Sequence, residues 1–71
     1  MSKPEFVELA PQEEVRTYTF PGDELVTLDN VVRIAVSASG NHRLETADGV
    51  KHIVPAGWLH IAFLSDGDWT F

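Results

Sequence analysis

The dipeptide Asp48-Gly49 constrains the fold of this chain more than any other feature, because it separates two short segments of alternating apolar and polar residues. A two-residue loop in a type I′ turn needs positive φ at both central positions, which Asp and Gly tolerate. The dipeptide therefore predicts a β-hairpin in which residues 41–47 pair with residues 50–54. The register of such a turn pairs Ala47 with Val50, Leu44 with Ile53, Glu45 with His52 and Arg43 with Val54.

Turn residues recur along the chain at spacings of about eight to twelve residues, and the runs between them are rich in β-branched and aromatic residues. This spacing is typical of a small all-β sandwich or barrel, and no long helical period lies between the turns. We expect strands at residues 15–20, 31–37, 41–47, 50–54 and 58–64. Residues 24–28 are a short further candidate, and the terminal residues 69–71 would complete the core as an edge strand.

Two structures fit residues 1–14. Ser2, Pro4 and Glu5 match a capping box that opens a short helix, which Pro11 would end. An acidic extended arm is the alternative. The sequence thus predicts an acidic arm or helical turn at residues 1–14 and a single β domain at residues 15–71. The expected fold is an all-β, five- to six-stranded meander that forms a partly closed barrel or sandwich.

The predicted register places one row of apolar side chains across four strands. Ile34 faces Leu44 across the loop at 37–41, and Ile53 faces Leu59 across the turn at 55–57. We expect this row to lie in the core, with Leu44→Ala and Ile53→Ala among the most destabilising substitutions. Period-two alternation adds four more side chains to the same face, those of Val32, Val36, Ile61 and Phe63.

The length and composition exclude several classes of function. Seventy-one residues make one domain, and the absence of cysteine excludes disulfides, thiolate catalysis and cysteine-containing zinc sites. The chain has neither a glycine-rich phosphate loop nor a Gly-x-Ser-x-Gly elbow, so we expect no enzyme activity and no cofactor. It also lacks a signal peptide and an apolar membrane-spanning run, so we expect no membrane contact and a cytoplasmic location.

The charge is unevenly distributed. The chain has a formal net charge of −6, and residues 1–29 carry most of it. No basic patch is visible, so direct binding to nucleic acid is not expected. The leading hypothesis is a small acidic interaction module that binds a basic protein surface or peptide. One version is an inhibitor that presents carboxylates where a nucleic-acid-binding protein expects phosphates.

An aromatic groove flanked by acids is a second reason to expect peptide binding. Small β-barrels that bind extended peptides use such grooves, although the same aromatics could instead close the core. The candidate binding residues are therefore acidic or aromatic: Glu13, Glu14, Asp23, Glu24, Tyr18, Trp58 and Trp69.

The opposite face of the predicted sheet carries one further constellation. In the predicted register Glu45, His52 and His60 lie side by side with Arg33, and two histidines with one carboxylate can bind zinc or iron. The alternative is a solvated row in which Glu45 is shared between Arg33 and a histidine. If Glu45 faces His52, the carboxylate raises the pKa of that imidazole. We interpret His42, at a strand end on the core face, as a structural histidine.

A homo-oligomeric assembly is the alternative function. A strand-rich chain with a small core gains buried surface by pairing sheet edges or packing aromatic faces against other copies. Light scattering would separate a monomeric module from a subunit of such an assembly.

Overall fold

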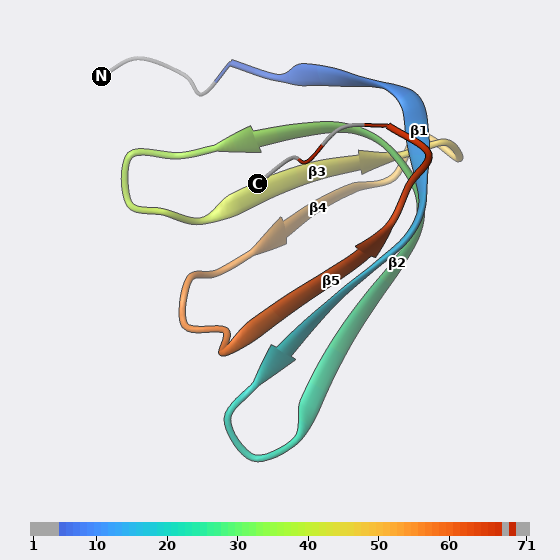
Figure 1. The fold of residues 1–71 in the computed structure, drawn as a ribbon. Helices are drawn as coiled ribbons and strands as arrows, with labels where there is room; N and C mark the ends of the chain where they lie inside the picture. The colour runs from blue at the N-terminus through green and yellow to red at the C-terminus, as the bar shows by residue number, and fades with distance from the viewer. Residues whose placement is uncertain (1–4, 68, 70–71) are drawn as a thin grey trace.

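The fold is all-β, as the sequence predicts. The computed structural model describes residues 5–67 and 69, and these form one antiparallel sheet without a helix (Figure 1). Its strand order is β4-β3-β2-β1-β5, and the sheet does not close into a barrel. The strands are β1 (Val7–Phe20), β2 (Glu24–Val36), β3 (His42–Thr46), β4 (Lys51–Val54) and β5 (His60–Leu64).

The first strand begins earlier than expected. Residues 7–14 form the first half of β1, so a helix that continues to Pro11 is wrong, and the extended alternative is correct for these residues. Ser2 and Pro4, which belong to the expected helix start, lie outside the described residues. The expected strand at 69–71 also falls mostly outside them.

The two longest strands, β1 and β2, bend sharply partway along their length (Figure 1). The pairing between them is interrupted between Glu8 and Glu13, and Asn30 in β2 has a φ of 54°. The left-handed backbone conformation of Asn30 breaks the alternation of side chains between the two faces. Leu28 and Val31 are therefore both buried, although residues three apart in a regular strand point to opposite faces. The bend wraps the two halves of the hairpin around a common interior.

This curvature explains the place of β5. The strands β4 and β5 are opposite edges in the hydrogen-bonding order, yet only residues 55–59 connect them. A connection of that length spans the two edges only when the sheet curls back on itself. Because β5 lies beside β1, the expected meander is correct for the first four strands and wrong for the last.

The interior is filled from β1, β2, β3 and β4. Partly buried side chains, including Trp58 and Ile61, pack against this cluster, and Ile34 faces Leu44 as predicted. The buried apolar core consists of Tyr18, Leu28, Val31, Ile34, Leu44 and Val54.

The β3–β4 hairpin forms, but its turn and its register differ from the prediction. Thr46 N donates to the carbonyl of Val50 and Gly49 N donates to the carbonyl of Thr46, so the loop has three residues rather than two. Only Gly49 in this loop has a positive φ, at 86°, which rules out a type I′ turn. The carboxylate of Asp48 stabilises the loop by accepting from Thr46 Oγ1 and Val50 N.

One extra loop residue shifts every pair by one. Leu44 faces His52, Arg43 faces Ile53, and Ile53 lies on the outer face with 65% of its surface exposed. The predicted pairing of Ile53 with Leu59 is also wrong, because β5 pairs with β1 and Leu59 is 72% exposed. Of the other expected core residues, Val32, Ile61 and Phe63 are partly buried and Val36 is exposed.

Candidate functional site

The two free edges of the sheet differ in how they are protected against pairing. The edge strand β4 is short and carries Lys51, and both features discourage the addition of another strand. The edge strand β5 has the sequence HIAFL, which contains no acidic residue and no lysine or arginine. Among the described residues, no strand pairs with the outer side of β5. The β5 edge is therefore the open end of the sheet.

The hydrogen bonding of β1 shows which β5 backbone groups face outward. Leu59 N donates to the carbonyl of Thr19 at 2.7 Å, so this carbonyl points toward β5. Backbone groups alternate in direction along an antiparallel strand, and Thr19 pairs with His60. By this alternation His60, Ala62 and Leu64 bond to β1, while Ile61 and Phe63 direct their N–H and C=O groups to the free edge.

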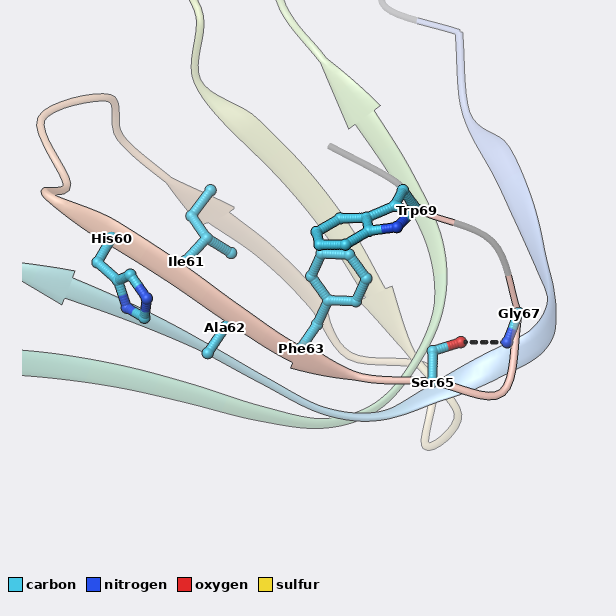
Figure 2. A pocket seen from close by; sticks show the side chains of 7 residues that line it. All are labelled: His60, Ile61, Ala62, Phe63, Ser65, Gly67 and Trp69. Atoms are coloured by element: carbon cyan, nitrogen blue, oxygen red, sulfur yellow. Dashed lines mark hydrogen bonds between the residues drawn. The ribbon is translucent and has the colours of Figure 1, made fainter.

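A groove of about 450 Å³ follows this edge. Consecutive residues of β5 line it, and their side chains point to both faces of the strand (Figure 2). Trp69 stands over Phe63 with ring centroids 5.9 Å apart and planes at 86°, and 91% of its surface is exposed. The complete lining is His60, Ile61, Ala62, Phe63, Ser65, Gly67 and Trp69.

A second pocket of about 180 Å³ adjoins the groove. The two cavities share Ser65, Gly67 and Trp69 as a common wall. The remaining lining comes from the first half of β1, at residues 7–11 and Glu13. An occupant of the groove that extends past Ser65 thus reaches the second pocket.

A buried ion pair supports the groove from inside. The Arg16 guanidinium lies 4.8 Å from the centre of the Phe63 ring, on the inner face of the sheet. Glu13 holds Arg16 through two bonds, from Nε to Oε1 at 2.8 Å and from Nη2 to Oε2 at 2.9 Å. The exposed fractions of the two side chains are 0% for Arg16 and 1% for Glu13. Burial lowers the pKa of Arg16, but its bonds to Glu13 and Tyr18 outweigh burial and raise it overall.

The buried polar chain continues from Arg16 to His42. Arg16 Nη1 donates to Tyr18 Oη at 3.2 Å, and Tyr18 Oη lies 2.6 Å from His42 Nδ1. Tyr18 Oη accepts from Arg16 and has its own proton to donate to His42 Nδ1, an arrangement that goes with a neutral imidazole protonated on Nε2. Trp58 covers both rings, with centroid distances of 5.1 Å to Tyr18 and 4.5 Å to His42.

Burial is the main influence on the pKa values of His42 and Tyr18. Burial, followed by the positive charge of Arg16, lowers the pKa of His42, and Glu13 opposes the shift. Burial also raises the pKa of Tyr18, against the effect of Arg16. Every buried polar side-chain atom of the described residues has a hydrogen-bond partner. The network of Glu13, Arg16, Tyr18 and His42 is therefore fully hydrogen-bonded and suits a structural role. The expectation that His42 is structural agrees with this arrangement.

The candidate binding residues fall into three groups. Trp69 lines the groove, whereas Glu14, Asp23 and Glu24 are exposed but lie outside its lining. Glu13 and Tyr18 are buried, although Glu13 also lines the second pocket, and Trp58 is half-buried against Tyr18 and His42. Sequence reasoning missed the β5 edge and Arg16. Alternation could have indicated Arg16, because it shares the inner face of Tyr18 and Phe20.

The predicted metal row does not form. Glu45 faces Lys51, His52 points to the opposite face of the sheet, and His60 lies on β5 at the other edge. Among the described residues, no group of three His, Asp or Glu side chains is arranged to hold a metal ion. The predicted pairing of Glu45 with His52 is therefore wrong. The predicted proximity of Arg33 and Glu45 is correct, because Arg33 Nη1 lies 3.0 Å from Glu45 Oε2.

Comparisons with protein-family models, curated proteins and solved structures find no match to this chain. Within the described part of the chain, no helix is long and apolar enough to cross a membrane. The features that bear on function are therefore the open β5 edge, the groove along it and the acidic surface around it.

Proposed function

We propose that this protein is a small acidic interaction module that binds an extended segment of a basic partner by strand addition to β5. The observation that carries the proposal is the open β5 edge with a groove along it. An exposed edge offers a row of backbone donors and acceptors to an incoming strand, and adjacent pockets provide side-chain specificity. The groove meets both requirements, since Ile61 and Phe63 supply the backbone groups and Trp69 forms a wall.

The charges favour a basic partner. The net charge is −6, and Glu8, Glu14 and Asp66 are exposed on the segments next to β5 or its groove. Among residues 5–67 the exposed lysine and arginine side chains outside an ion pair are Arg43 and Lys51, both on the β3–β4 hairpin beyond β2. Such a surface accelerates association with a cation-bearing segment and makes binding sensitive to salt.

A second copy of this chain is a less favoured occupant of the same edge. Pairing β5 with β5 would bring together two molecules that each carry a net charge of −6, and like charges oppose association. A basic segment meets the same edge without that repulsion. The inhibitor that imitates nucleic-acid charge is a special case of the proposal, in which the partner is itself a nucleic-acid-binding protein. A cytoplasmic location is part of the proposal.

A selection from a displayed library of random dodecapeptides tests the proposal. We expect enrichment of peptides that combine alternating apolar residues with lysine or arginine. Binding should be lost in Ile61→Pro and retained in part in Ile61→Ala. Both substitutions remove the partly buried side chain, but only proline removes the outward N–H, and proline is tolerated where the N–H of an edge strand faces solvent.

Two results would contradict strand addition. One is a library that yields no binder while circular dichroism shows that the protein is folded. The other is equal binding by Ile61→Pro and Ile61→Ala, which would mean that the backbone edge is not used. Light scattering of the wild-type protein at micromolar concentration tests the alternative, because a dimer that Ile61→Pro dissociates would show that β5 pairs with another copy.

A further inference from the structure

We propose that the pocket next to the groove binds one lysine or arginine side chain of the segment that adds to β5. This inference rests on the proposed function and adds to it a defined site for a basic side chain. The pocket lies between the first half of β1 and the wall formed by Ser65, Gly67 and Trp69. It is therefore a place where the acidic protein can distinguish a basic segment from a neutral one.

The position of the pocket matches the path of an added strand. The groove runs along residues 60–63 and continues to Ser65 and Gly67, which also line the pocket. A strand paired with β5 thus reaches the pocket at the Ser65 end of the groove. At about 180 Å³ the pocket suits one long side chain and is too small for a second strand.

The charges around the pocket leave an excess of carboxylate. Glu8 lines it with a side chain 75% exposed, and its partner Arg33 is shared with Glu45. One guanidinium between two carboxylates leaves a net charge of −1. Glu13 also lines the pocket, but Arg16 already neutralises it. Asp66 is exposed between two residues of the common wall. A cation entering the pocket is therefore attracted mainly by Glu8, with support from Asp66.

Trp69 gives the pocket a second means of binding a cation. An indole ring attracts an ammonium or guanidinium group positioned over its face, and tryptophan does so more strongly than the other aromatic residues. The long alkyl part of lysine or arginine can meanwhile pack on Val7 and Leu9 at the pocket wall. The site combines an exposed carboxylate, an aromatic ring and an apolar wall, which together match a long basic side chain.

The test repeats the dodecapeptide selection on three proteins: wild type, Glu8→Gln and Glu24→Gln. Both variants remove one exposed carboxylate, but Glu24 lies at the far end of the β1–β2 hairpin, away from the pocket. In the peptides enriched on wild type, we expect lysine or arginine at one fixed position relative to the alternating apolar residues of the peptide. This preference should weaken on Glu8→Gln, which keeps Asp66 and Trp69, and should persist unchanged on Glu24→Gln.

Affinities of one selected peptide then give the size of the effect. Replacing its fixed lysine by norleucine should weaken binding to wild type by up to about fivefold, the upper end of the range measured for exposed ion pairs. The same replacement should have a clearly smaller effect on binding to Glu8→Gln, in which only Asp66 and the Trp69 ring still attract the cation.

The outcomes separate this inference from the proposed function. Apolar peptides without a fixed basic position would overturn the pocket assignment and leave strand addition intact. A fixed basic position that Glu8→Gln and Glu24→Gln weaken equally would also overturn it, because overall acidity would then explain the preference. Failure to enrich any peptide would contradict the proposed function itself.

Discussion

Breaking the buried pair of Glu13 and Arg16 should be among the most damaging changes to this protein. In Glu13→Leu the Arg16 guanidinium stays in the interior. It loses its two bonds to the Glu13 carboxylate, which are 2.8 and 2.9 Å long. Removing one partner of a buried ion pair costs about 3–5 kcal/mol, because the remaining charge stays buried without the carboxylate that balanced it. A domain of 71 residues has a total stability of about 4–10 kcal/mol at 0.05–0.15 kcal/mol per residue. The single variant should therefore be unfolded in large part or have a much lower melting temperature.

The matched double variant separates the charge from the packing. In Glu13→Leu/Arg16→Met both charges are gone and the apolar volume is kept, so most of the lost stability should return. Tyr18 loses a donor but keeps its bond to His42. Urea unfolding followed by tryptophan fluorescence measures the free energy of unfolding of four proteins: the wild type, Glu13→Leu, Arg16→Met and the double variant.

Two results would refute this reasoning. A loss below about 1 kcal/mol in Glu13→Leu would mean that the buried charge of Arg16 does not depend on Glu13 for its compensation. A double variant as unstable as the single variant would mean that the pair stabilises the fold through its own bonds and not merely by mutual neutralisation.

Two further predictions concern pH and the core. The folded-state pKa of His42 is lowered, so the folded protein binds fewer protons than the unfolded chain, and the stability present above the unfolded value of about 6.5 should decrease as the pH falls below it. Urea midpoints at successive pH values should show this decrease in the wild type and a smaller one in His42→Gln, and equal slopes would contradict the assignment. Leu44→Ala should destabilise the protein by about 2–5 kcal/mol because Leu44 is 1% exposed. Ile53→Ala should change stability by about 0.5 kcal/mol or less because Ile53 is on the surface, and thermal unfolding of both variants would expose an error if their losses were equal.

The sequence was sufficient for the features that depend on neighbouring residues. Period-two alternation and the spacing of turn residues determined the all-β class and the approximate position of the strand residues from Val15 onward, although residues 24–28 and 31–36 belong to one strand, β2. The pairing of Ile34 with Leu44 also followed from the chain, because alternation decides which side chains share a face and the short loop between the strands then selects the register. The acidic character of the molecule is a property of composition and needed no structure.

Only the tertiary structure decided the β3–β4 register and the partner of β5. A turn with Asp48-Gly49 is compatible with a loop of two residues or of three, and the bonds of Asp48 to Thr46 and Val50 favour three. Residues 55–59 look like a hairpin loop in sequence. In the fold they cross from one edge of a curled sheet to the other, because the bend near Asn30 brings those edges together.

The candidate site depended on the same long-range geometry. An edge strand and a central strand can have the same apolar pattern, so the openness of β5 follows from strand order and not from the sequence HIAFL. Glu13 and Arg16 are charged residues that sequence reasoning assigns to the surface. They are buried because the bend of β1 brings them within bonding distance of each other, and burial of a charge is tolerable only when its partner is buried with it.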